Sequence, residues 1–142
     1  MTINLKNFLN DKTKLSKMGE FQTLKQIEGL EMSAVSADLY GNGRDDLTLF
    51  YFSKGANYAT VTTTNSIISE TISWNNNSHK KSIKGLMVNT KNANTFTGKQ
   101  GKESLDIIAK NLSRILTIKE SKSEKGTSET VRIKDLIFAS TG

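Results

Sequence analysis

The sequence predicts an α/β protein in which helices pack on a mixed β-sheet. Three short apolar runs rich in β-branched or aromatic residues, at 47–52, 83–88 and 133–139, are typical of strands. Between the second and third runs, apolar residues repeat at helical spacing. These residues are Leu105, Ile107, Ile108, Leu112, Ile115 and Leu116. The strand, loop and helix over residues 83–116 form half of a βαβ unit, which indicates the fold class.

The first half of the chain is predicted to contain a helix followed by strands. Apolar residues recur at rough helical spacing within residues 1–20, which predicts an amphipathic helix with a basic outer side. They are Leu5, Phe8, Leu9, Leu15 and Met18. Residues 31–39 indicate a strand, joined to the run at 47–52 by a tight turn at Gly41-Asn42-Gly43. A second turn at 54–57 precedes residues 58–64, whose β-branched content predicts a further strand.

Polar segments divide the second half of the chain. Residues 66–74 fit a short helix about as well as a strand, and the polar run at 74–81 is predicted to be a loop. Thr97 or Ser104 can supply the N-cap of the long helix. Residues 121–129 contain charged residues, Ser and Gly without any apolar side chain, so we expect a mobile surface loop there.

Composition excludes several kinds of site. The chain has 142 residues, no Cys, no Pro and one His, His79. Disulfide scaffolds, Cys-ligated zinc, thiol catalysis and polyhistidine metal sites are therefore excluded. The apolar runs are far shorter than the roughly 20 residues of a membrane-spanning helix, and the first residues lack a secretory signal pattern. We expect a cytoplasmic protein without a membrane partner.

The net charge of +6, from 20 Lys and Arg against 14 Asp and Glu, raises the alternative of a stand-alone basic binding module. The charge distribution favours a solvated surface instead. Only Arg44, Arg114 and Arg132 are arginines, and most Lys have an acid within a few positions. We therefore expect no nucleic-acid partner.

A loop between two predicted strands carries a weak calcium pattern. Asp38, Asn42 and Asp46 lie at four-residue intervals among glycines, which resembles the calcium loops of blade-repeat propellers. Tyr40 stands where such loops carry Asp or Asn, and the pattern occurs once although blades come in arrays. A plain turn is the favoured interpretation, with no metal, and a single calcium-binding loop is the alternative.

Two polar corners follow the strands at 83–88 and 133–139. The Asn-rich corner, residues 89–101, leads into the long helix and includes Asn89, Asn92, Asn94, Thr97 and Gly98. Backbone N–H groups at a helix N-terminus suit an anion or a polar ligand, and a loop stabilised by its own Asn side chains is the alternative. The Thr-Gly corner, residues 139–142, has the small and hydroxyl side chains that can face a developing oxyanion.

Taken in order, the corners resemble a known family. The pattern Val-Asn-x-x-Asn-Ala-Asn-x-x-Thr-Gly-x-Gln-Gly, then a helix, then a strand ending in Ala-Ser-Thr-Gly, is similar to the N-terminal part of the ornithine acetyltransferase (ArgJ) family. Gly43-Arg44-Asp45-Asp46-Leu47 and Thr63-Thr64-Asn65 resemble two further family segments. Lys91 and Phe96 depart from the pattern, because the family usually has Gly and a small residue there.

The resemblance runs from residue 29 to residue 142 and implies the N-terminal portion of an ornithine acetyltransferase-like (DmpA/ArgJ-like) fold. We expect residues 1–142 to form a single domain, the N-terminal (α-subunit side) fragment of a longer acyltransferase. Residues 1–28 match poorly and are expected to be a helical extension.

The resemblance also implies an activity in arginine biosynthesis. Family members transfer acetyl from N2-acetyl-L-ornithine to L-glutamate, without a cofactor apart from acetyl-CoA as donor in bifunctional members. A self-cleaved precursor yields a Thr nucleophile at the start of a C-terminal β subunit, and a Thr-Gly pair matching Thr141 and Gly142 forms the oxyanion hole. We therefore expect a chain that is inactive alone and has the β subunit as its partner. The Asn-rich corner has no assigned role, and the two corners are expected to border a common hollow.

Overall fold

The computed structural model describes residues 25–77, 82–122 and 129–142. The helix predicted within residues 1–20 lies outside these ranges. Residues 78–81 of the predicted polar loop and residues 123–128 of the predicted surface loop also lie outside them.

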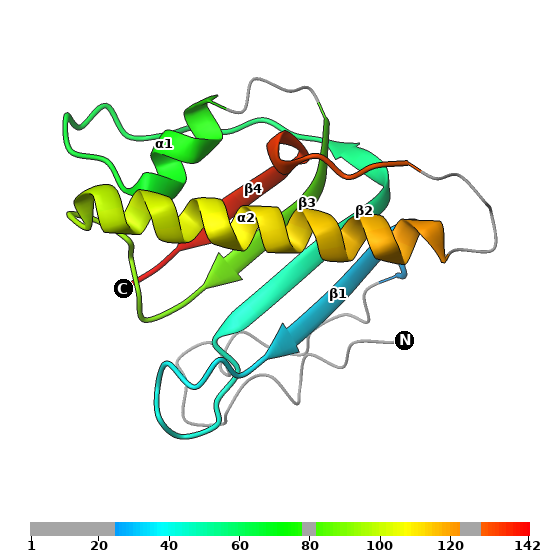
Figure 1. The fold of residues 1–142 in the computed structure, drawn as a ribbon, viewed down its shortest axis with the longest axis horizontal. Helices are drawn as coiled ribbons and strands as arrows, with labels where there is room; N and C mark the ends of the chain where they lie inside the picture. Colours follow the sequence, from blue (N-terminus) through cyan, green and yellow to red (C-terminus); the bar gives the residue numbers. More distant parts are fainter. Residues whose placement is uncertain (1–24, 78–81, 123–128) are drawn as a thin grey trace.

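The described residues form a four-stranded mixed sheet with a long helix across one face (Figure 1). Strands β1 (Leu30–Val35), β2 (Leu47–Asn57), β3 (Ser82–Asn89) and β4 (Leu136–Ser140) lie in that order in the sheet. β1 pairs with β2 and β2 with β3 in antiparallel fashion, whereas β3 and β4 are parallel. The other elements are α1 (Glu70–Asn77), α2 (Gly98–Ser121) and the 3₁₀ turn η3 (Ile133–Asp135) directly before β4. The predicted α/β class is confirmed.

The β3–α2–β4 unit contains the core. Leu105, Ala109 and Leu116 of α2 are buried against Leu136 and Phe138 of β4 in one apolar cluster. Parallel strands need a crossover connection, and α2 provides it. Because parallel strands end at the same edge of a sheet, this unit brings Asn89 and Ser140 opposite each other as paired residues.

Strand β2 is longer than the sequence predicts. The predicted turn at 54–57 lies within β2, because Ala56 and Asn57 pair with Ile83 and Ser82 after a register shift that follows Tyr51. The irregularity accommodates Gly55 at a φ of 73°, a left-handed conformation that glycine adopts readily. The prediction of a strand at residues 58–64 is wrong, since these residues form no strand.

The connection between β1 and β2 is also different from the prediction. β1 ends at Val35 rather than near residue 39, and β2 begins at Leu47, so the strands are joined by a long loop instead of a tight turn. Gly41 and Gly43 have φ values of 67° and 70°, as expected for this loop chemistry. The predicted strands are therefore present, but their connection is not a tight hairpin.

Helix α1 protects the outer edge of β4. The prediction of a loop from Trp74 was wrong at Trp74–Asn77, which are helical. The Trp74 indole N–H donates to the Leu136 carbonyl at 3.0 Å, and the Asn75 side chain both donates to the Phe138 carbonyl and accepts from its N–H, at 2.7 and 3.0 Å. Asn75 thus makes the hydrogen bonds that a neighbouring strand would make with this edge. The sequence of α1 has only a weak preference for a helix, and its contacts with β4 stabilise it.

Candidate functional site

The Asn-rich corner is held together around Asn94 at the start of α2. The Thr97 hydroxyl donates to Asn94 Oδ1 at 2.6 Å, and the Asn94 backbone carbonyl accepts the N–H of Glu70 at 3.1 Å. Thr97 is the N-cap residue of α2, as one of the two predictions had it, but its side chain makes no capping hydrogen bond to the helix. Its hydroxyl instead fixes the loop, and Ser104 lies inside the helix.

Asn89 joins the Asn-rich corner to the Thr-Gly corner. Its side-chain N–H donates to the Asn92 carbonyl at 2.9 Å, and its side-chain oxygen accepts the Ser140 hydroxyl at 2.6 Å. Its backbone carbonyl accepts the Thr141 N–H at 3.0 Å. A Cβ atom placed on Gly142 would lie 3.4 Å from the Cβ of Ala93. The structure therefore places the two corners side by side.

A cavity of about 740 Å³ opens beside the junction of the corners. Asn89, Asn92, Asn94, Thr97 and Ser140 line it, together with apolar residues of β2, β3, β4 and α2. Among the described residues, its lining includes no Lys, Arg, His, Asp or Glu, and neither Thr141, Gly142 nor Gly98 belongs to it. The described lining therefore provides amides and hydroxyls without a fixed charge, and the cavity reaches Ser140 of the Thr-Gly corner but not Thr141 or Gly142.

The Thr-Gly corner has two free donor groups in the described part of the chain. The Thr141 N–H is occupied by the Asn89 carbonyl, whereas no hydrogen bond is found for the Thr141 hydroxyl or the Gly142 N–H among the described residues. A hydroxyl and an N–H group on adjacent residues can bind one oxygen atom that carries negative charge. At Thr141, the backbone N–H is therefore occupied, and the side-chain hydroxyl is the donor that remains available.

Strained backbone marks the Asn-rich corner. Lys91, Asn94 and Phe96 have φ values of 66°, 49° and 58°. Only Gly, Asn and Asp adopt this left-handed region at little cost, which explains why glycine suits position 91, and Lys91 is strained there. Phe96 is 83% exposed at the same corner.

The loop with the calcium pattern is braced by its own carboxylate. Asp46 is buried, and its two oxygens accept the N–H groups of Ala37 and Leu39 at 2.6 and 2.7 Å. Asp38 accepts the Gly43 N–H at 3.4 Å. Within residues 25–77, 82–122 and 129–142, no group of three or more His, Cys, Asp or Glu side chains is arranged to hold a metal ion. These contacts favour the plain-loop interpretation.

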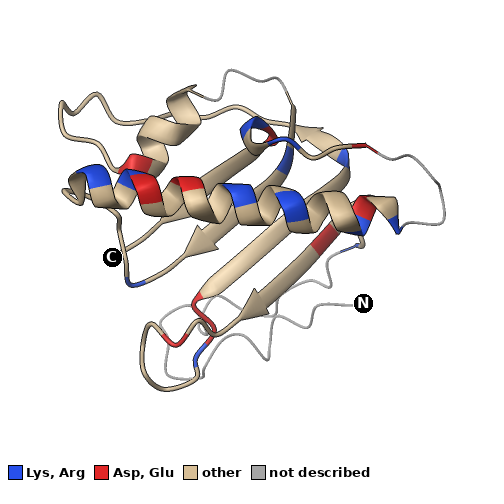
Figure 2. Cartoon of the chain, viewed as in Figure 1, with Lys and Arg blue, Asp and Glu red and all other residues tan. Residues whose placement is uncertain are grey.

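The long helix α2 carries charged residues of both signs. Figure 2 shows Lys, Arg, Asp and Glu interleaved along α2. Lys119 pairs with Glu31 at 2.9 Å, and Lys99 lies 3.6 Å from Glu103. Such exposed pairs favour a solvated surface over a phosphate-binding stripe. None of the described helices is long and apolar enough to cross a membrane.

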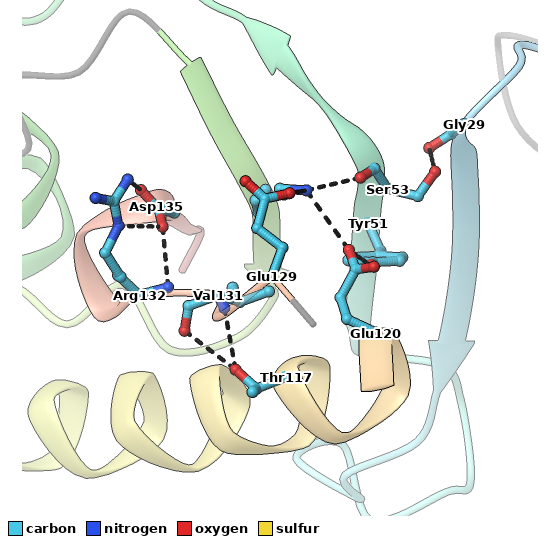
Figure 3. Close-up of polar contacts among 10 residues, drawn as sticks. Gly29, Tyr51, Ser53, Thr117, Glu120, Glu129, Val131, Arg132 and Asp135 are labelled. Atoms are coloured by element: carbon cyan, nitrogen blue, oxygen red, sulfur yellow. Dashed lines mark hydrogen bonds and ion pairs between the residues drawn. The ribbon is translucent and has the colours of Figure 1, made fainter. Parts of the chain in front are cut away.

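Sequence reasoning missed an ionic cluster around the buried Lys84 and Glu120 at the other end of β3. The Lys84 ammonium donates to the Ser53 carbonyl and to Glu129, both at 2.7 Å, and lies 3.5 Å from Glu120. The Tyr51 hydroxyl donates to Glu120, which lies beside it at the end of α2 (Figure 3). Burial, followed by the hydrogen bond to Glu120, raises the pKa of Tyr51 well above its usual range. No local pattern signals this cluster, because its members come from β2, β3, α2 and the segment before β4.

Known proteins match this chain over most of its length. The ArgJ family model matches residues 31–141. The arginine biosynthesis bifunctional protein ArgJ of Caulobacter vibrioides is 29% identical over 126 residues, which cover 86% of this chain and 28% of that protein. The protein of the same name from Psychrobacter arcticus is 36% identical over 90 residues, which cover 62% of this chain and 22% of that protein. The match thus spans between 22% and 28% of the length of these relatives.

Two solved structures have a similar fold. Ornithine acetyltransferase from Mycobacterium tuberculosis, solved with ornithine, has a TM-score of 0.68 and 20% identity, and the match covers 81% of this chain and 56% of that one. The arginine biosynthesis bifunctional protein from Bacillus halodurans has a TM-score of 0.56 and 20% identity, with 78% and 53% covered. The mixed sheet with its helices therefore corresponds to part of the fold of these proteins.

Proposed function

The chain belongs to the ArgJ family, and from that premise we propose that it forms the oxyanion-hole part of an acyltransferase of arginine biosynthesis. The proposed reaction moves an acetyl group from N2-acetyl-L-ornithine to L-glutamate through an acetyl-threonine intermediate. Acetyl-CoA is an additional donor if the enzyme is bifunctional, and no other cofactor is required. We place this reaction in the cytoplasm.

The availability of two donors at the Thr-Gly corner supports this proposal most directly. When a nucleophile adds to the acetyl carbonyl, its oxygen gains negative charge. The Thr141 hydroxyl and the Gly142 N–H are the donors proposed to bind that oxygen, since the Thr141 N–H is already paired with Asn89. Because the end of β4 holds both groups before the reaction begins, they stabilise the charge with little reorganisation.

We propose that the nucleophilic Thr and most substrate-binding groups belong to a β subunit that this chain does not include. The chain covers only 28% of the C. vibrioides protein, which leaves room for those groups. It covers 56% and 53% of the two solved chains, so these are considerably shorter than the curated relative. A two-subunit enzyme accounts for that difference.

Acetyl transfer to glutamate tests the proposal. We expect no turnover by the 142-residue chain alone, and turnover when it is joined to the C-terminal portion of the C. vibrioides protein. In the joined protein, Thr141→Ala is expected to lower kcat by roughly 10²- to 10³-fold, as the loss of one oxyanion donor does. Thr95→Ala is the matched control, because the hydrogen bond found for the Thr95 hydroxyl among the described residues goes to the Ala93 carbonyl within the loop. Turnover by the isolated chain, an inactive joined protein or an unaffected Thr141→Ala variant contradicts the proposal.

A further inference from the structure

We infer that Asn89 is a positioning residue, which couples the Asn-rich corner to the Thr-Gly corner and orients Thr141 for the reaction. This inference rests on the proposed function for its catalytic consequence. Its structural part, that Asn89 controls the conformation of the Thr-Gly corner, stands on contacts within the described residues alone.

Three groups of Asn89 carry out the coupling. The side-chain N–H holds the Asn92 carbonyl, the side-chain oxygen holds the Ser140 hydroxyl, and the backbone carbonyl holds the Thr141 N–H. Beyond the β3–β4 ladder, both hydrogen bonds found for the Thr-Gly corner in the described part of the chain therefore end on Asn89. The corner has no second polar anchor there.

The residue type at position 89 suits this task. An Asn side chain presents a donor and an acceptor on one short planar amide, so it can bind a carbonyl on one side and a hydroxyl on the other. The substitution Asn89→Asp would keep an acceptor for Ser140, but it would remove the donor to the Asn92 carbonyl and set a negative charge against that carbonyl. The substitution Asn89→Ala would remove both side-chain contacts while leaving the backbone carbonyl in place.

Orientation of Thr141 is the expected catalytic consequence. While the Asn89 carbonyl binds the Thr141 N–H, no hydrogen bond is found among the described residues for the Thr141 hydroxyl or the Gly142 N–H. If the Thr-Gly corner becomes more mobile, these two donors are no longer held in a fixed position. The free energy of activation then rises, because negative charge on the carbonyl oxygen is stabilised less well. Substrate binding before that step is not expected to change, so kcat should fall while KM stays the same.

Amide hydrogen exchange in the 142-residue chain tests the structural part. We compare Asn89→Ala and Ser140→Ala with the matched control Asn75→Ala. Asn75 is also an Asn that binds β4, but it does so at Phe138 on the other edge of the strand. In Asn89→Ala and Ser140→Ala, we expect the exchange rate of the Thr141 amide to rise relative to that of the core amides. The expected rise is roughly three- to tenfold for each hydrogen bond that is lost. Asn75→Ala should change Thr141 exchange only as much as core exchange. Ser140→Ala removes a single contact and keeps the test valid if Asn89→Ala does not fold.

Kinetics in the joined acyltransferase test the catalytic part. Asn89→Ala and Asn89→Asp are expected to lower kcat by roughly tenfold or more with KM unchanged, whereas Asn75→Ala leaves both within about twofold. Unchanged relative exchange at Thr141, or a raised KM with an unchanged kcat, overturns the inference. If the joined wild-type protein is inactive, the proposed function fails, and the exchange comparison still decides whether Asn89 positions the corner.

Discussion

Replacing Gly101 by Ala sets two physical effects of opposite sign against each other. Gly101 lies in the first turns of α2, where alanine is the better helix former by about 1 kcal/mol. A Cβ atom at this position would lie 1.8 Å from the Thr97 hydroxyl oxygen, 2.5 Å from the Thr97 Cβ and 2.4 Å from Asn94 Oδ1. These separations are far below contact distance, so Thr97 and Asn94 must move.

The steric effect is expected to be larger than the helix effect. Rotation of the Thr97 side chain cannot relieve the contact with its own Cβ, so the backbone of the corner must shift, as in an overpacked core, at about 1 to 3 kcal/mol. The hydrogen bond between Thr97 and Asn94 is lost as well, at about 1 kcal/mol. After the helix gain is subtracted, Gly101→Ala should lower the free energy of unfolding by about 1 to 3 kcal/mol.

Urea unfolding followed by circular dichroism measures this change. Thr97→Ala isolates the lost hydrogen bond and should cost less than Gly101→Ala, and Lys102→Ala controls for a substitution on the exposed side of the same turn. A Gly101→Ala protein with an unfolding midpoint equal to or above that of the wild type would show that the corner adapts freely and that the steric reasoning is incorrect.

Three further outcomes follow from the described contacts. Lys91→Gly should raise the free energy of unfolding by about 1 kcal/mol in a urea titration, because a left-handed backbone costs lysine more than glycine, whereas Lys91→Ala should bring no such gain. Lys84→Met should lower it by about 3 kcal/mol, because Glu120 stays buried without its cation, and the double variant with Glu120→Met should recover most of the loss. Because the pKa of Tyr51 is raised in the folded state, the unfolded state loses that proton first, so the contribution of Tyr51 to stability is complete below pH of about 10 and declines above it. Tyr51→Phe should weaken the fall in stability above pH of about 10, and identical pH profiles for the two proteins would count against the raised pKa.

Elements with a strong local pattern could be predicted from the sequence. The apolar stripe of Leu105, Leu112 and Leu116 determines α2, and the runs before the two corners determine β3 and most of β4. A helix of this length and a buried strand depend mainly on the spacing of their own apolar side chains. The corner motifs were visible for the same reason, as short continuous patterns.

Elements that depend on distant partners could not be predicted in this way. Residues 74–77 become helical because Trp74 and Asn75 meet β4, 62 and 63 positions away. Gly55 looks like a turn residue, yet it continues β2 because the strand pairs again with β3 beyond it. In both cases tertiary hydrogen bonds outweigh weak local preference.

The sequence by itself determined the presence of the two corners, the strands before them and the helix between them, since each depends on a pattern of residues that are close together in the sequence. The tertiary structure alone decided that Asn89 meets Ser140, 51 positions away, and that the Thr141 N–H is occupied while its hydroxyl is not, within the described residues. The reason is that these contacts require β3 and β4 to pair as parallel neighbours in one register. That pairing depends on how α2 packs across the whole sheet and not on any local pattern.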